Sequence, residues 1–174
     1  MVLEVKKDCA QYHFMPGWPS SPTMRDLRFV AEHRGGPLKK ELHSRLMEWA
    51  IACAEHILPL YPRELDGRLK HALAVARKWA EGEVPTGAAM KASLEAHAAA
   101  RESEDSVAVA VSRSIGQAVA TAHMADHSLG AAWYALKAVK AHGGSVEAER
   151  EWQDGHLPAD VMELVRSARG RRNI

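Results

Sequence analysis

Two histidines four residues apart, His123 and His127, are the side chains whose type and spacing most plainly suggest chemistry. They lie in the segment ATAHMADHSLG, where Asp126 directly precedes the second histidine. On one helix, a spacing of four residues puts both imidazoles on the same face, about a turn apart. Histidines at this spacing are typical zinc ligands, so one hypothesis is a metal- or ligand-binding helical enzyme with a histidine cluster.

A catalytic zinc site needs more than this pair, because the metal takes three protein ligands and keeps one position open. His97, on the neighbouring expected helix, is the best third candidate, so the candidate metal ligands are His97, His123 and His127. The order His-x-x-Asp-His is similar to inverted zinc-peptidase motifs, but those carry glutamate where this chain has Asp126. Aspartate is one methylene shorter and reaches a metal-bound water less well.

The competing interpretation is that these residues pack helices together. Gly116, Ala120 and His123 form a strip of mostly small side chains, which suits the close approach of two helices. A histidine there can bond to another helix as a buried polar group, while Asp126 caps the helix that follows. We favour packing, and we expect no resident metal or cofactor and no catalytic residue.

Two further groups of polar residues are candidate ligand sites. His97 and Arg101 share one face of an expected helix, where the arginine fork suits a carboxylate or another anion. The alternative, which we prefer, is an interhelical salt bridge from Arg101 to one of three carboxylates: Asp66, Glu48 or Glu55. Glu55 and His56 could also place a partly buried carboxylate beside an imidazole, as in general acid–base catalysis.

Trp133, Tyr134 and Trp152 are the candidate anchors of a protein interface. Tryptophan and tyrosine are common at the centres of interfaces, but large aromatic side chains are also buried for packing. The sequence leaves these two roles open.

Composition and charge disfavour several classes of protein. The 174 residues include 23 lysines and arginines and 22 aspartates and glutamates, so a net charge of +1 attracts neither nucleic acid nor an anionic membrane. No apolar run approaches the ~20 residues that span a bilayer, and the N-terminus lacks the apolar segment of a secretory signal. The two cysteines, Cys9 and Cys53, form no C-x-x-C pair, which favours reduced thiols and a cytoplasmic location.

Hydrophobic periodicity predicts an all-α fold. We expect a single-domain array of about seven helices in antiparallel hairpins around a central Ala/Gly-rich helix. Residues 1–23 are expected to form an irregular lead-in, residues 24–169 a single helical domain, and residues 170–174 a basic frayed tail.

Glycines and prolines predict the limits of the first two helices. A short helix over residues 25–34 is expected to stop at Gly35 and Gly36. Pro37 suits the first position of the next helix, which must end near Pro59.

Capping residues predict where the later helices begin. Asp66, Thr86, and Asp105 or Ser106 are expected to cap the next three helices. The apolar run that starts at Ser106 is too long for one helix, so we expect a break between Asp126 and Gly130. Gly143 then ends a helix, and two shorter helices over residues 146–153 and 158–168 complete the fold.

Several segments, taken in order, resemble the immunity five-like group of bacterial immunity proteins. They are RDLRFVAEHRGGPL, EWAIACAEHILPLY, SLEAHAAARES, AVATAHMADHSLGAAWYALKAVKA and EREWQDGHLP, and they cover about residues 24–165. The resemblance implies an all-helical cytoplasmic protein that binds and neutralises a partner toxin. It supplies no catalytic residues.

A non-enzymatic binding protein is therefore the expected function. The sequence has no G-x-S-x-G, P-loop or G-x-G-x-x-G motif, which suits a binding protein better than an enzyme. The expected partner is a protein toxin, whose class the balanced charge leaves open, and a homodimer is also left open.

Overall fold

The computed structural model describes residues 26–172, which form an all-α fold as predicted. Within this range the chain makes three 3₁₀ turns and seven α-helices. The turns are η2 (Leu27–Phe29), η3 (Glu32–Arg34) and η4 (Leu58–Leu60). The α-helices are α1 (Lys40–His56), α2 (Gly67–Ala80), α3 (Thr86–Arg101), α4 (Ser106–Ala120), α5 (His127–His142), α6 (Val146–Gly155) and α7 (Ala159–Arg172).

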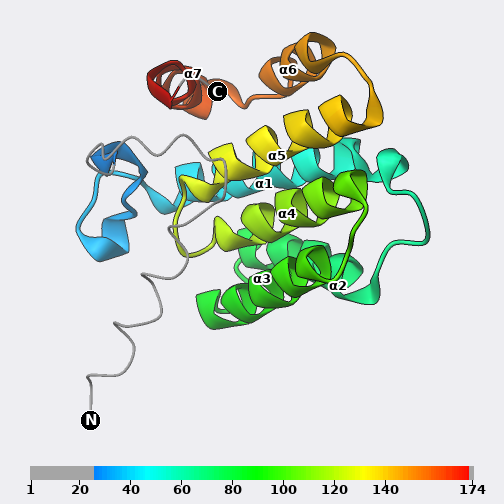
Figure 1. Cartoon of the computed structure of the whole chain (residues 1–174). Helices are drawn as coiled ribbons and strands as arrows, with labels where there is room; N and C mark the ends of the chain where they lie inside the picture. Colours follow the sequence, from blue (N-terminus) through cyan, green and yellow to red (C-terminus); the bar gives the residue numbers. More distant parts are fainter. Residues whose placement is uncertain (1–25, 173–174) are drawn as a thin grey trace.

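Helix α4 lies at the centre of the molecule, as its small apolar residues predict. It packs against α5 and α1 on one side and against α3 and α2 on the other, while α6 and α7 lie beyond α5 and α1 (Figure 1). All its residues are buried except three that follow one another at helical spacing, Ser106, Val109 and Arg113. These three positions therefore form one stripe of α4 that no other helix covers.

Local capping residues define several of the helix ends. Asp66 and Asp105 cap α2 and α4 as expected, because their carboxylates accept hydrogen bonds from the backbone N–H groups of Arg68 and Ala108. Gly143 ends α5 with a φ of +86°, in the left-handed region that favours glycine.

The cap predicted at Thr86 is wrong. Pro85 occupies the N-cap position of α3, and the Thr86 hydroxyl instead accepts a hydrogen bond from the Trp79 indole at 3.2 Å. This bond joins α3 to α2 and leaves the first turn of α3 without a side-chain cap.

The break between the two central helices comes earlier than predicted. Helix α4 ends at Ala120 and α5 begins at His127, so the break covers residues 121–126. The buried His43 of α1 donates from Nε2 to the Thr121 carbonyl at 2.6 Å and so satisfies an acceptor that the helix end leaves open. Asp126 occupies the N-cap position of α5, but its side chain makes no capping hydrogen bond.

The helix predicted over residues 25–34 is wrong, and α1 begins at Lys40 rather than at Pro37. Leu38 donates its N–H to the Val30 carbonyl at 3.0 Å and accepts from the N–H of Glu32 at 2.8 Å. Backbone groups engaged in this isolated bridge cannot continue a helix, so the segment forms two short 3₁₀ turns instead.

Substituting Gly36 with alanine tests this bridge. A Cβ at position 36 would lie 2.0 Å from the Val30 carbonyl oxygen, so the backbone must shift to admit it. We expect Gly36→Ala to lower the free energy of unfolding by about 1–2 kcal/mol, measured by urea denaturation. Gly67→Ala is the control, since a Cβ at position 67 meets no atom within 4 Å. Equal stability of the two variants would contradict the prediction.

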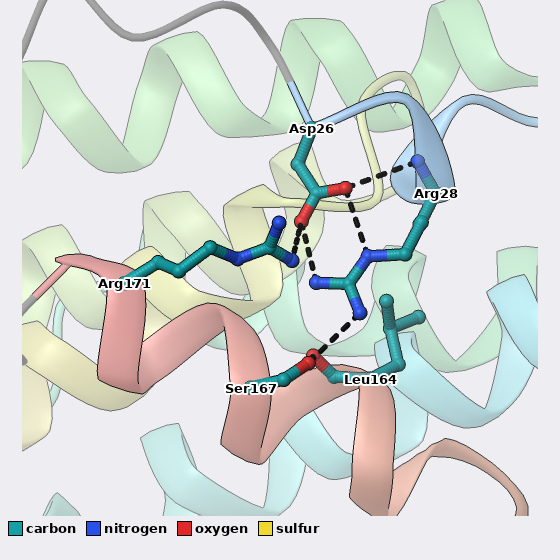
Figure 2. Close-up of polar contacts among 5 residues, drawn as sticks. All are labelled: Asp26, Arg28, Leu164, Ser167 and Arg171. Atoms are coloured by element: carbon teal, nitrogen blue, oxygen red, sulfur yellow. Dashed lines mark hydrogen bonds and ion pairs between the residues drawn. The ribbon is translucent and has the colours of Figure 1, made fainter.

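A second apolar cluster joins the two ends of the described chain. Phe29 and Leu38 are buried there with Val161, Val165 and Ala168 of α7. Polar contacts fix the same junction (Figure 2). Asp26 accepts hydrogen bonds from Arg28 and from Arg171 at 2.8 Å, and Arg28 also donates to the Ser167 hydroxyl at 2.8 Å. Helix α7 thus extends past the predicted 158–168 and takes in residues 170–172, which were expected to be frayed.

Candidate functional site

The predicted histidine cluster lies where α3, α4 and α5 meet. His127 is the first residue of α5, and its Nδ1 lies 2.6 Å from the Gln117 amide oxygen of α4, to which it donates. His123 lies in the break before α5, so the two histidines do not share a helix face, although their ring centres are 5.0 Å apart. The one-face argument from spacing is therefore wrong, and the turn brings the rings together instead.

His97 is held between α3 and α4 as a neutral imidazole. Its Nδ1 accepts a hydrogen bond from Arg113 Nη1 at 3.2 Å, which leaves the proton on Nε2. Burial lowers the pKa of His97 to about 3, and the positive charge of Arg113 acts in the same direction. The imidazole therefore stays uncharged at neutral pH and serves as an acceptor for the arginine.

Gly116 lets the two helices approach closely around this ring. A Cβ at position 116 would lie 2.6–2.9 Å from three atoms of the His97 ring. The Ser93 hydroxyl of α3 also donates to the Gly116 carbonyl at 3.0 Å. The small residue predicted to permit close packing does so against His97.

The histidine cluster does not assemble a metal centre within residues 26–172, where no group of three or more His, Cys, Asp or Glu side chains could hold an ion. The Nδ1 atoms of His97 and His127 are engaged with Arg113 and Gln117. Through these contacts, the neutral His97 joins α3 to α4, and His127 joins α5 to α4.

The remaining predicted polar residues lie in separate contacts. Glu55 pairs with Arg77 of α2, and His56 lies 2.7 Å from the buried Glu149 carboxylate of α6. Arg101 is exposed at the end of α3 and does not form the expected salt bridge. The three proposed acceptors pair with other arginines, Asp66 with Arg68, Glu48 with Arg45 and Glu55 with Arg77.

A buried polar network that was not among the predicted sites joins α1, α5, α6 and α7. Gln153 is fully buried, donating to the Ala132 carbonyl at 3.1 Å and to Glu149 at 2.8 Å. Arg169 donates to Gln153 and to Asp154, and Trp49 donates to the Gln153 carbonyl at 3.0 Å. Glu149, Gln153 and Asp154 are close together on α6, but the sequence does not show that Trp49, Ala132 and Arg169 meet them, because these three residues lie far away along the chain.

The predicted aromatic anchors fall into two places. Trp152 is stacked between His56 and His156, with ring centres 3.7 and 3.9 Å away. Trp133 packs edge-on against Tyr134, with Lys137 Nζ 4.0 Å from the centre of the Trp133 ring. Tyr134 is mostly buried, and burial raises the pKa of its phenol.

Of these residues, Tyr134 and Lys137 line a groove between α4 and α5. It has a volume of about 650 Å³ and is lined by Ser106, Val109, Ala110, Arg113, Tyr134, Lys137, Lys140 and Ala141. The two helices run antiparallel, since Ser114 of α4 contacts Ala131 of α5, whereas Gln117, further along α4, contacts the earlier His127. We refer to this cavity as the α4–α5 groove.

Most of this groove was absent from the predicted site, which included only Tyr134. A signal was present, because Arg113 is the one charged residue in the α4 sequence SVAVAVSRSIGQAVA. It also lies at helical spacing from Val109 and Ser106, the other positions of α4 that are not buried. Arg113 is partly buried on this otherwise uncharged helix, and a partly buried charged side chain is a candidate binding residue.

None of the helices within residues 26–172 combines the length and apolar character that a membrane span requires.

Comparison with known families relates the chain to a family of immunity proteins. A family model described as "Imm-5 like putative immunity protein" matches residues 36–160, which include helices α1 to α6 and both the histidine cluster and the groove. No curated protein and no solved structure matches the chain.

Proposed function

The chain belongs to the Imm-5-like family of putative immunity proteins, and from this premise we propose that it binds a partner toxin and blocks it without catalysing a reaction. In this proposal the protein acts in the bacterial cytoplasm as a preformed helical surface. The family match over residues 36–160 is the observation that carries the proposal.

The surface chemistry of the fold supports binding to a protein. Interfaces are rich in tyrosine, tryptophan and arginine, and they combine an apolar centre with a polar rim. The α4–α5 groove has this character, since Tyr134 and Val109 lie inside it and lysines border it. Buried hydrogen bonds hold α4 and α5 together. Binding therefore requires little further ordering of these helices, which keeps its entropic cost low.

Co-expression with the toxin gene tests the proposal directly. The product of the gene adjacent to this one should arrest growth when expressed alone, and co-expression of this protein should restore growth. The two purified proteins should bind with a dissociation constant below about 1 μM, measured by calorimetry. Failure both to restore growth and to bind would refute the proposed function.

Light scattering of the free protein and of the mixture gives the stoichiometry. A second species with the mass of a complex is expected only when both proteins are present. This measurement also shows whether the free protein is a monomer or a homodimer.

A further inference from the structure

The α4–α5 groove carries positive charge that no carboxylate within residues 26–172 neutralises. Arg113, Lys137 and Lys140 line it, and none of them takes part in the ion pairs of the described residues. No aspartate or glutamate is among the described lining residues. On a protein with a net charge of only +1, this is a local concentration of cations that have no carboxylate partner among the described residues.

Arg113 is the cation best placed to recognise an anion. Its side chain is partly buried against Tyr134, and within the described residues its guanidinium makes one hydrogen bond, to His97. The bond to the neutral His97 orients the guanidinium and leaves further N–H groups for an acceptor. A carboxylate is the acceptor that fits this planar fork in a bidentate manner, and partial exclusion of water strengthens such a pair.

The floor of the groove is apolar. Ala110 of α4 and Tyr134 of α5 are buried there beside the half-buried Val109, while the exposed Lys137 and Lys140 border the opening. A cavity of about 650 Å³ has room for several side chains of a partner. The groove thus offers an apolar surface beside a cluster of cations.

We infer that the partner toxin docks in the α4–α5 groove through an acidic segment that also carries an apolar side chain. A carboxylate of that segment pairs with Arg113, and the apolar side chain packs between Val109 and Tyr134. Lys137 and Lys140 attract the segment and speed its approach. This inference rests on the proposed function, because it names the part of the toxin that the protein recognises.

Charge reversal on the exposed lysines tests the inference without disturbing the core. The double variant Lys137→Glu/Lys140→Glu should bind the toxin about tenfold or more weakly in calorimetry, with the loss mostly in the association rate at low salt. Lys78→Glu/Lys91→Glu is the matched control, since these two lysines of α2 and α3 are exposed and do not line the groove. The control should bind like the unchanged protein.

Two further substitutions test the apolar contact beside Val109 and the pairing of a carboxylate with Arg113. Val109→Trp should block the apolar side chain and weaken binding about tenfold or more, whereas Leu94→Trp, at an exposed leucine of α3, should not. Arg113→Lys keeps the charge but not the fork, so its affinity should fall by about tenfold. Circular dichroism melts confirm that each variant is folded before binding is measured.

The results separate the inference from the proposed function. If the unchanged protein binds the toxin and the groove variants bind equally well, the docking site is elsewhere and the inference is wrong, while the function stands. Loss of binding in Leu94→Trp alone would place the interface on α3 and also overturn it. If free protein is a dimer with Lys137 protected from acetylation, the groove holds a second copy instead of the toxin. If the unchanged protein does not bind, the proposed function itself fails.

Discussion

Lowering the pH from 6.5 to 4 is expected to destabilise the folded protein by about 3 kcal/mol through His97 alone. The folded state holds the pKa of His97 at about 3, against 6.5 for an ordinary histidine. Between these values the unfolded chain binds a proton that the folded chain does not, so stability falls by about 1.4 kcal/mol per pH unit. The contribution of neutral His97 to the free energy of unfolding is fully present above pH 6.5 and is lost as the pH falls towards 3. Burial also lowers the pKa of His43, which adds a loss of the same sign.

Urea denaturation at several pH values measures this slope. His97→Asn removes the titrating ring, so its free energy of unfolding should fall less steeply between pH 6 and 4 than that of the unchanged protein. Ile115→Val is the control, because it removes one methylene from the same helix core without removing a titratable group. A slope in His97→Asn as steep as in the control would show that His97 is not the cause.

Gly116→Ala is expected to lower the free energy of unfolding by about 2 kcal/mol. The new methyl group would lie 2.6 Å from the nearest atom of the buried His97 ring, which is held by Arg113 and cannot move aside freely. Overpacking of this kind costs about 1–3 kcal/mol, and the better helix propensity of alanine offsets part of it. Urea denaturation at pH 7.5, where His97 is neutral, isolates the steric effect.

Two further variants test whether the methyl group at position 116 clashes with the His97 ring. Gly87→Ala in α3 adds a methyl group where no atom lies within 4 Å, so it should be neutral or slightly stabilising. The double variant His97→Ala/Gly116→Ala should be more stable than the sum of its single changes predicts, because the methyl group then occupies space vacated by the ring. Additive effects would show that the His97 ring is not what Gly116 accommodates.

The parts of the fold that local signals determine could be predicted from the sequence. Asp105 and Asp66 cap helices through backbone groups two or three residues away, and Gly143 ends a helix through its own φ angle. The segment before α1 could not be predicted, because its conformation depends on the pairing of Val30 and Glu32 with Leu38. The break after Ala120 depends similarly on a distant residue, His43.

The same distinction between local signals and distant contacts applies to the candidate site. Spacing identified His123 and His127, but only the packing of α3 on α4 shows that His97 accepts from Arg113. The α4–α5 groove could not be found from one segment, since its cations come from two helices that pack together in the fold. The family resemblance was recognisable because it depends on consecutive residues, and the matched model confirms it over residues 36–160.

The junction of Asp26 with Arg171 has a consequence for the order in which the protein is built. The two partners are 145 positions apart, so the ribosome must synthesise nearly all the described chain before this contact can form. Contacts between residues so distant in sequence also form slowly, because a large loop must close first. Residues 26–38 therefore reach their native packing only after α7 has been translated. Helices α1 to α5, which include the two that line the groove, are therefore synthesised before the complete fold can form.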